Sequence, residues 1–236
     1  MWTKFEAIPV HGDQLRDKPS SCVRLFYENV DGFSVDLSRP ALKNNTKLAY
    51  FSHLLSRLQV DVVAGVETCT NWSFVPSSHS VPRLLNQREG SRSVTAHNEH
   101  ERFSLKQQGG TFITAFQGLG DYSPITGKDP SGLGRWCWLR LGQPQCSTRI
   151  VVAYQACNTR KTAHCATMAQ QRRYWISKGD RRSPRAIFCE QFLAQLRIWR
   201  SEGEKLLVLM DANEDMQRGK LARELTGEEL KMVDVI

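Results

Sequence analysis

Short apolar runs that end abruptly in a polar side chain constrain the fold of this sequence more than any other feature. The last of them, residues 206–210, leads directly into Asp211 and Asn213. A dense run of five apolar residues is typical of a strand that is buried on both faces. Ligands of open α/β sheets bind beyond the carboxyl ends of the strands, so this carboxylate and this amide are candidate site residues. Taken alone, the pair is more simply explained by an Asx turn that closes the strand.

The first third of the chain repeats this pattern twice. Residues 22–28 alternate between apolar and polar side chains, which predicts a strand, and Asn29 and Asp31 follow it on one face. The apolar run at residues 60–66 predicts a second strand, which ends in Glu67. A lone Glu at the start of a loop is usually a surface residue. Glu67 is therefore a candidate site residue only because other strands also end in polar side chains.

A helix and a fourth polar strand end complete the pattern. Residues 41–59 carry an apolar stripe at helical spacing, and a helix between two strands predicts a parallel crossover unit. A later strand ends in Tyr154, and Arg160 follows as a candidate clamp for a phosphate. Tyr154 by itself also fits a core residue with a hydrated tip. Further strands are predicted at residues 111–116, 135–141 and 149–154.

Two tryptophans on the strand predicted at 135–141 are expected in the core. Trp136 and Trp138 share one face, and Cys137, Leu139 and Leu141 share the other. Because both faces have packed-core composition, burial is favoured over a platform on which bases stack.

The net charge of +8 is concentrated in one segment. Residues 160–200 hold 10 Lys and Arg against 2 Asp and Glu, a local charge of +8, which indicates a polyanionic partner such as a nucleic acid. The alternative is a solvated basic surface. Ser183 and Pro184 then predict the start of a helix, as N-cap and first helical residue. The candidate nucleic-acid contacts are Arg172, Arg173, Lys178, Arg181 and Arg182.

The remaining segments give weaker predictions. Residues 1–21 are interpreted as a leader or linker, and residues 71–108 as a polar surface excursion with some helix. Histidines in that excursion, at positions 79, 97 and 100, are expected to be solvated rather than to bind metal. Residues 214–236 are expected to be partly helical, with a strand starting near Val233.

Seven cysteines without a CxxC pair indicate reduced, mostly packed thiols in an intracellular protein. No apolar run is long enough to span a membrane, and no secretory signal is visible. A zinc site from Cys157, His164 and Cys165 matches no standard ligand spacing and is disfavoured.

In chain order, these strand ends resemble the endonuclease/exonuclease/phosphatase superfamily, which has the DNase I-like fold. The resemblance extends over residues 22–215. Within the superfamily, the sequence is most similar to the apurinic-endonuclease-like branch, which includes the endonuclease domains of non-LTR retrotransposons. The segments that carry it are Tyr27-Glu-Asn-Val-Asp-Gly, Gly65-Val-Glu-Thr, Gln108-Gly-Gly-Thr, Val152-Ala-Tyr and Met210-Asp-Ala-Asn-Glu.

The resemblance implies an α/β fold, a four-layer sandwich of two packed mixed β-sheets flanked by helices, formed by residues 22–236. It also implies a divalent cation, Mg²⁺ or Mn²⁺, bound by Glu67 with Asp31 nearby. By the same resemblance, Asp211 would be the general base or align the attacking water, and Asn213 and Asn29 would orient Asp211 and a phosphate oxygen. Tyr154 and Arg160 would bind the scissile phosphate. The expected partner is a nucleic acid, DNA more than RNA, with no membrane.

One departure from the family pattern leaves the activity open. The family ends with a late Asp and a Ser-Asp-His ending, whereas this sequence stops at Ile236 with all six His at or before His164. A domain without its C-terminal strands is therefore expected. The leading function is a metal-dependent DNA endonuclease of mobile-element or repair-like type. The alternatives are a phosphodiesterase or phosphatase for inositol phosphates, phospholipids or RNA, and a catalytically inactive nucleic-acid-binding remnant.

Overall fold

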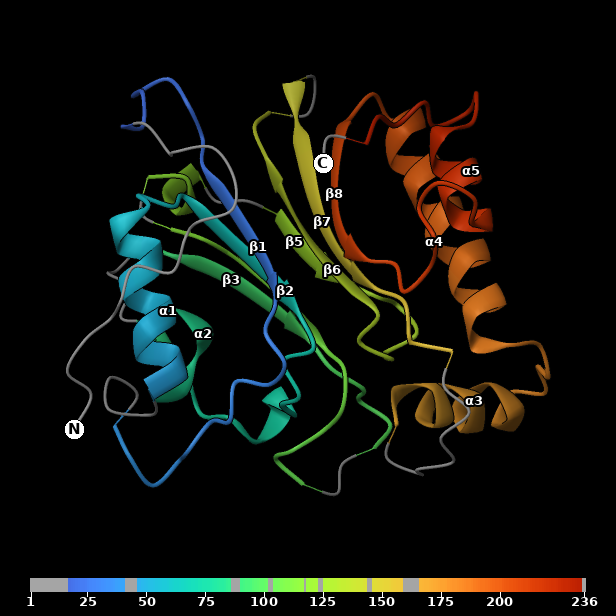
Figure 1. Cartoon of the computed structure of the whole chain (residues 1–236), viewed down its shortest axis with the longest axis horizontal. Helices are drawn as coiled ribbons and strands as arrows, with labels where there is room; N and C mark the ends of the chain where they lie inside the picture. Colours follow the sequence, from blue (N-terminus) through green and yellow to red (C-terminus); the bar gives the residue numbers. More distant parts are fainter. Residues whose placement is uncertain are drawn as a thin grey trace.

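Two four-stranded sheets are each built from one contiguous half of the chain (Figure 1). The computed structural model describes residues 17–40, 46–85, 90–101, 104–116, 118–122, 125–143, 146–158 and 166–234. The first sheet has the strand order β1-β2-β4-β3 and the second has the order β5-β6-β7-β8. The first sheet comprises β1 (Leu25–Asn29), β2 (Val62–Val66), β3 (Arg92–Ala96) and β4 (Thr111–Ala115). The second comprises β5 (Ile125–Lys128), β6 (Trp136–Leu141), β7 (Thr148–Tyr154) and β8 (Lys205–Asp211).

Both sheets are mixed, as predicted. β1 pairs with β2 in parallel through the helix α1 (Thr46–Arg57), and β7 pairs with β8 in parallel through α3 (Thr167–Ser177) and α4 (Pro184–Ser201). The remaining neighbours are antiparallel. The crossover predicted from residues 22–67 is therefore confirmed, because a parallel pair needs a connection that returns over the sheet.

Helices cover the outer faces of the two sheets (Figure 1). The side chain of Ser183 accepts a hydrogen bond from the Ala186 amide at 3.1 Å, so the predicted N-cap of α4 is confirmed. The shorter helices are α2 (Val81–Leu84), α5 (Lys220–Thr226) and three 3₁₀ turns at Trp72–Phe74, Ser77–His79 and Gly120–Tyr122. Among the described residues, every helix is too short or too polar to cross a bilayer.

The period of two in the strands sorts the core into three layers. On β2, Val62, Ala64 and Val66 face the other sheet, whereas Val63 packs toward α1. On β6, Cys137 and Leu139 face the first sheet, and Trp136 and Trp138 face α4. Trp136 is 1% exposed and its ring lies 5.4 Å from that of Phe192, so the prediction that these tryptophans belong to the core is confirmed.

Several predictions for the surface segments were wrong. The excursion 71–108 contains the strand β3, and its His79 and His97 are both only 8% exposed rather than solvated. His79 is held by a 2.7 Å hydrogen bond between Nε2 and the Arg39 carbonyl oxygen. At the C-terminal end, Val233 and Asp234 belong to no strand, and residues 235–236 lie outside the described part.

Other predictions fall partly outside the described residues. Of the leader predicted at 1–21, residues 1–16 are not described, and Lys18 forms an ion pair with Asp61. Arg160, His164 and Cys165 are also outside the described part. The six described cysteines are all free thiols, as expected, but Cys22, Cys146 and Cys157 are exposed and only Cys137 and Cys189 are buried, so the expectation that they are mostly packed was wrong.

Candidate active site

The polar strand ends meet because they continue the face that points between the two sheets. Leu25 and Tyr27 on β1 pack in the inter-sheet core, as do Leu207 and Leu209 on β8. Two residues further along each strand, the same faces carry Asn29 and Asp211. The side-chain period of two therefore delivers this amide and this carboxylate to one end of the inter-sheet core.

Asp211 is held by donors from both sheets. Asn29 Nδ2 donates to Asp211 Oδ2 at 3.2 Å, and the backbone amide of Asn213 donates to Oδ1 at 3.2 Å. The Asp211 carbonyl accepts a hydrogen bond from the Gln155 amide at 3.0 Å, which continues the β7–β8 pairing. The carboxylate is thus oriented at the seam between the sheets, and no basic side chain among the described residues forms an ion pair with it.

The side chain of Asn213 is fixed by the loop that follows β7. Its Nδ2 donates to the Gln155 carbonyl at 2.9 Å, and its Oδ1 accepts from the Cys157 thiol at 2.6 Å. Cys157 is exposed as a residue, but partial burial of its thiol, followed by the charges of Asp211 and Glu67, raises the pKa of that thiol. Sequence reasoning had considered Cys157 only as a zinc ligand, because its position three residues beyond a strand carries no motif.

Tyr154 is the link between Asp211 and Glu67. It is 5% exposed, pairs with Asp211 in the β7–β8 register, and donates its hydroxyl hydrogen to the Glu67 carboxylate. Burial, this hydrogen bond and the nearby negative charges raise the pKa of Tyr154 far above its ordinary value. The phenol therefore stays protonated and acts as a donor.

Tyr27 was missed in the sequence, where it was only an alternating residue of a strand. Burial, followed by the charges of Asp211 and Glu67, raises the pKa of Tyr27 well above its ordinary value. Its hydroxyl is buried and has no hydrogen-bond partner among the described residues. Two protonated phenols thus flank the two carboxylates.

Three candidate residues adopt left-handed backbone conformations. The φ angles are 42° at Asp31, 55° at Glu67 and 46° at Asn213. Such conformations cost about 1–3 kcal/mol each for residues other than Gly and cluster at functional sites. Glu67 is anchored by a 2.7 Å bond from the Gly32 amide to its carbonyl, which ties the loop carrying Asp31 to the end of β2.

The oxygen donors at this end of the sheets fit a hard divalent cation. Within the described part, none of Asp31, Glu67 and Asp211 forms an ion pair with a basic side chain, so their negative charge is uncompensated. The described residues contain no group of three or more His, Cys, Asp or Glu arranged as a metal cage. One or two carboxylates with retained water is the coordination that Mg²⁺ accepts in phosphoryl-transfer sites.

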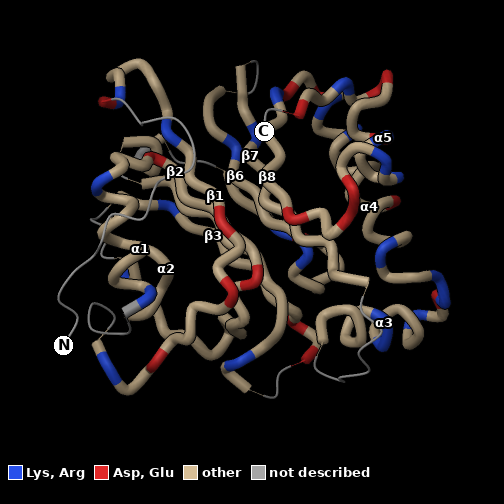
Figure 2. The backbone as a smooth tube through the Cα atoms, in the orientation of Figure 1, with Lys and Arg blue, Asp and Glu red and all other residues tan. Residues whose placement is uncertain are grey.

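The basic segment places Lys and Arg residues along α3 and the start of α4 (Figure 2). Some of these side chains form ion pairs and others do not. Arg173 is paired with Glu101, and Arg182 with Asp180 and Glu190. The exposed Arg172, Lys178 and Arg181 have no ion-pair partner in the described part of the chain. A further arginine, Arg185, was left out of the predicted site. Its guanidinium joins the loops after β7 and β8 through the Ala156 carbonyl at 2.8 Å and Glu214 at 3.4 Å.

Comparison with known proteins identifies the architecture. No protein-family model and no curated protein matches the sequence. The structure is similar to the human Nocturnin catalytic domain with bound sulfate, with a TM-score of 0.52 and 12% identity over 88% of this chain and 69% of that chain. It is also similar to the 3′-5′ exonuclease NExo of Neisseria meningitidis (TM-score 0.47, 14% identity, 80% and 57% covered). A third similar structure is the endonuclease domain of TRAS1, a telomere-specific non-LTR retrotransposon (TM-score 0.44, 11% identity, 87% and 68% covered). The order of the strands and the two packed mixed sheets agree with the similarity to the Nocturnin domain, and the chain therefore has the DNase I-like fold.

Proposed function

We propose that the chain is a divalent-metal-dependent phosphodiesterase that cuts nucleic acid, with DNA as its main substrate. The observation that carries the proposal is the pair of cross-sheet contacts, Asn29 to Asp211 and Tyr154 to Glu67. They join a candidate base, a candidate metal ligand and a phenol donor at one end of the molecule. The similar Nocturnin structure holds a sulfate, a tetrahedral oxyanion of the same shape as phosphate.

Glu67, with Asp31 beside it, would hold Mg²⁺ or Mn²⁺. When bound, the cation would stabilise negative charge on the phosphoryl oxygens and increase the acidity of a water. Asp211 accepts the proton of the attacking water, and the donors from Asn29 and from the Asn213 amide keep its carboxylate in place. Tyr154 would exchange its hydrogen bond to Glu67 for one to an oxygen of the scissile phosphate, and Arg160 would donate to the same phosphate, where charge accumulates.

A plasmid-nicking assay tests the proposal. The chain is incubated with supercoiled DNA and Mg²⁺ or Mn²⁺, with EDTA as the metal-free condition. Nicking that needs the metal, and that falls by at least about 100-fold in Asp211→Asn and in Glu67→Gln, is expected. Glu28→Gln is the matched control, because Glu28 is exposed and lies on the opposite face of β1 from its neighbour Asn29.

The same assay with other substrates separates the competing activities. Metal-dependent turnover of an inositol phosphate, a phospholipid or RNA in place of DNA would change the substrate but keep the residue roles. DNA binding without turnover of any of these substrates would identify a non-catalytic binding protein. Nicking by Asp211→Asn and Glu67→Gln at the parent rate would refute the proposed site.

A further inference from the structure

Arg185, the second residue of α4, bridges the two loops that follow β7 and β8. Its Nη1 donates to the Ala156 carbonyl at 2.8 Å, and its Nη2 donates to Glu214 Oε2 at 3.4 Å. The side chains of Arg185 and Glu214 are only 18% and 15% exposed, so the bridge is largely shielded from water. A guanidinium presents several donors in one rigid plane, which lets a single side chain hold both loops at once.

The Ala156 end of the bridge lies between the two groups that hold the side chain of Asn213. The carbonyl of Gln155 accepts a hydrogen bond from Asn213 Nδ2 at 2.9 Å, and the thiol of Cys157 donates to Asn213 Oδ1 at 2.6 Å. Because Ala156 joins these two residues in the chain, a shift of its carbonyl would displace both partners of the Asn213 amide.

The Glu214 end of the bridge holds the residue that directly follows Asn213. Glu214 Oε1 accepts a hydrogen bond from the backbone amide of Leu221, the second residue of α5, at 2.7 Å. The carboxylate also lies directly against Gly219, where an added Cβ would be 1.9 Å from Glu214 Oε1. Glu214 is therefore fixed by α5 on one side and by Arg185 on the other.

A second contact from α4 supports the loop after β7. Gln155 Nε2 donates to the Sγ atom of Cys189 at 3.1 Å. Cys189 follows Arg185 by four residues, so the two side chains lie on the same face of the helix, one turn apart. Two successive turns of α4 thus hold Gln155 and Ala156.

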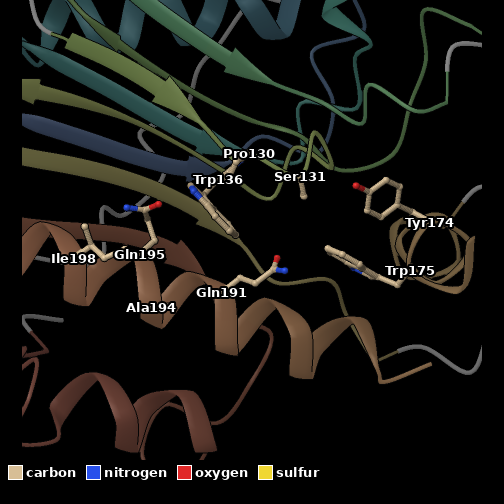
Figure 3. A pocket seen from close by; sticks show the side chains of 9 residues that line it. All are labelled: Pro130, Ser131, Trp136, Tyr174, Trp175, Gln191, Ala194, Gln195 and Ile198. Atoms are coloured by element: carbon tan, nitrogen blue, oxygen red, sulfur yellow. The ribbon is translucent and has the colours of Figure 1, made fainter. Parts of the chain in front are cut away.

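The helix that carries these contacts is itself firmly packed. The rings of Phe188 and Phe192 lie 5.9 and 5.4 Å from the ring of Trp136 on β6. Gln191 of the same helix lies beside Trp136, and both line a pocket between α4 and β6 (Figure 3). Since α4 is anchored on the second sheet, Arg185 can transmit that rigidity to the two loops.

We propose that Arg185 is a positioning residue of the candidate active site, which acts through Asn213 without touching the substrate. Asn213 has a φ of 46°, an unfavourable conformation for a residue other than Gly, so it depends on support from its surroundings. Its backbone amide donates to Asp211 Oδ1, which makes its conformation matter for the candidate base. The effect of Arg185 on catalysis rests on the proposed function, whereas its effect on the conformation of Asn213 does not.

NMR of the full chain without metal measures the effect on Asn213 directly. The side-chain NH₂ group of Asn213 gives its own pair of signals, which are assigned by their absence in Asn213→Ala. Arg185→Gln should shift this pair of signals, because it removes the cation that holds both loops. Arg185→Lys keeps the charge but can reach only one acceptor at a time, so it should shift them less. It takes the place of Arg185→Gln if that variant does not fold.

Arg197→Gln is the matched control for both kinds of measurement. Arg197 is on the same helix and also bridges two partners, since its guanidinium donates to Glu224 and Glu229. Neither partner belongs to the loops that hold Asn213. Its replacement should leave the Asn213 signals and the nicking rate unchanged.

A double-mutant cycle then tests whether Arg185 acts through Asn213 in the reaction. Arg185→Gln should lower the kcat of metal-dependent nicking by at least about 10-fold and leave KM unchanged, because the reacting groups are misaligned and binding is not lost. In the Asn213→Ala background the same substitution should have no further effect, since the residue that it positions is already absent.

Unchanged Asn213 signals in the Arg185 variants would overturn the inference, and so would an equal shift in Arg197→Gln. Losses of kcat that multiply in the double variant would also overturn it, because they would show that Arg185 acts independently of Asn213. Shifted Asn213 signals in a chain that nicks no DNA would support the positioning of Asn213 by Arg185 and overturn the proposed function alone.

Discussion

Asn29 and Asp211 are 182 residues apart in sequence, yet Asn29 Nδ2 donates to Asp211 Oδ2 at 3.2 Å. The two residues end β1 and β8, which are edge strands of different sheets. The bond is exposed, so its net contribution to stability is about 0.5–1.5 kcal/mol. Its main effect is to orient a carboxylate at the seam where the sheets meet.

Asn29→Ala should therefore separate activity from stability. Loss of the donor leaves Asp211 held only by the Asn213 amide, and we expect the nicking rate to fall by about 100-fold. The free energy of unfolding should fall by no more than about 1.5 kcal/mol. Nicking assays and urea titrations of the same preparations measure the two effects. A large loss of stability with unchanged nicking would contradict the orienting role of Asn29.

The raised pKa of Tyr27 predicts a loss of stability in alkali. The ordinary pKa of a Tyr is about 10, and burial near Asp211 and Glu67 raises it in the folded chain. The stabilising effect is complete below about pH 10, and it is lost as the pH rises further, because the unfolded chain then releases a proton that the folded chain retains. Urea titrations at several pH values should show a smaller loss of stability between about pH 9.5 and 11 in Tyr27→Phe than in the parent. Identical losses in the two proteins would exclude this contribution.

Gly110 should tolerate substitution much less well than Gly179. Both have positive φ, 88° and 82°, so Ala at either position costs about 1–2 kcal/mol in backbone strain. At Gly110 an added Cβ would also lie 2.6 Å from Thr68 Oγ1, whereas at Gly179 it would meet nothing within 4 Å. Gly110→Ala should therefore be the more destabilising by about 1–3 kcal/mol in urea titrations. It should also reduce nicking, because Thr68 directly follows Glu67. Equal destabilisation by the two substitutions would show that the contact with Thr68 is relieved without cost.

The unpaired basic residues should dominate the electrostatic part of DNA binding. Replacing Arg172, Lys178 and Arg181 with Gln should lower the slope of log K against log salt by about 2–3, near 0.9 for each lost phosphate contact. Arg173 and Arg182 must first leave their carboxylate partners, so replacing them should change the slope less per residue. Anisotropy titrations over a range of salt concentrations give both slopes. A larger effect per residue from Arg173 and Arg182 would contradict this division.

The sequence predicted those features of the fold that depend on local pattern. The apolar runs ending in Glu67, Tyr154 and Asp211 are strands, since two-sided burial requires continuous apolar sequence. β3 was missed because Arg92–Ala96 mixes polar and small residues and pairs only through β4, where Ser93 and Thr114 hydroxyls lie 2.8 Å apart. Its strand structure comes from a partner about twenty residues away, which no local pattern reveals.

The candidate site was predicted in part for the same reason. Asn29 and Asp211 could be placed because each directly ends a recognisable strand. The hydroxyl of Tyr27 and the thiol of Cys157 gain their surroundings only when the two sheets pack, so their sequence neighbours gave no signal. The pairing of Arg182 with Glu190 likewise depends on how the turn before α4 folds back.

Because each sheet is formed by one half of the chain, the candidate site residues are also divided between the two halves. A break between β4 and β5 would leave Asn29, Asp31 and Glu67 on one fragment and Tyr154, Asp211 and Asn213 on the other. Neither fragment alone would contain both the proposed cation ligand and the proposed proton acceptor. Nicking activity would then appear only when the two inactive fragments reassociate, as in a split reporter enzyme.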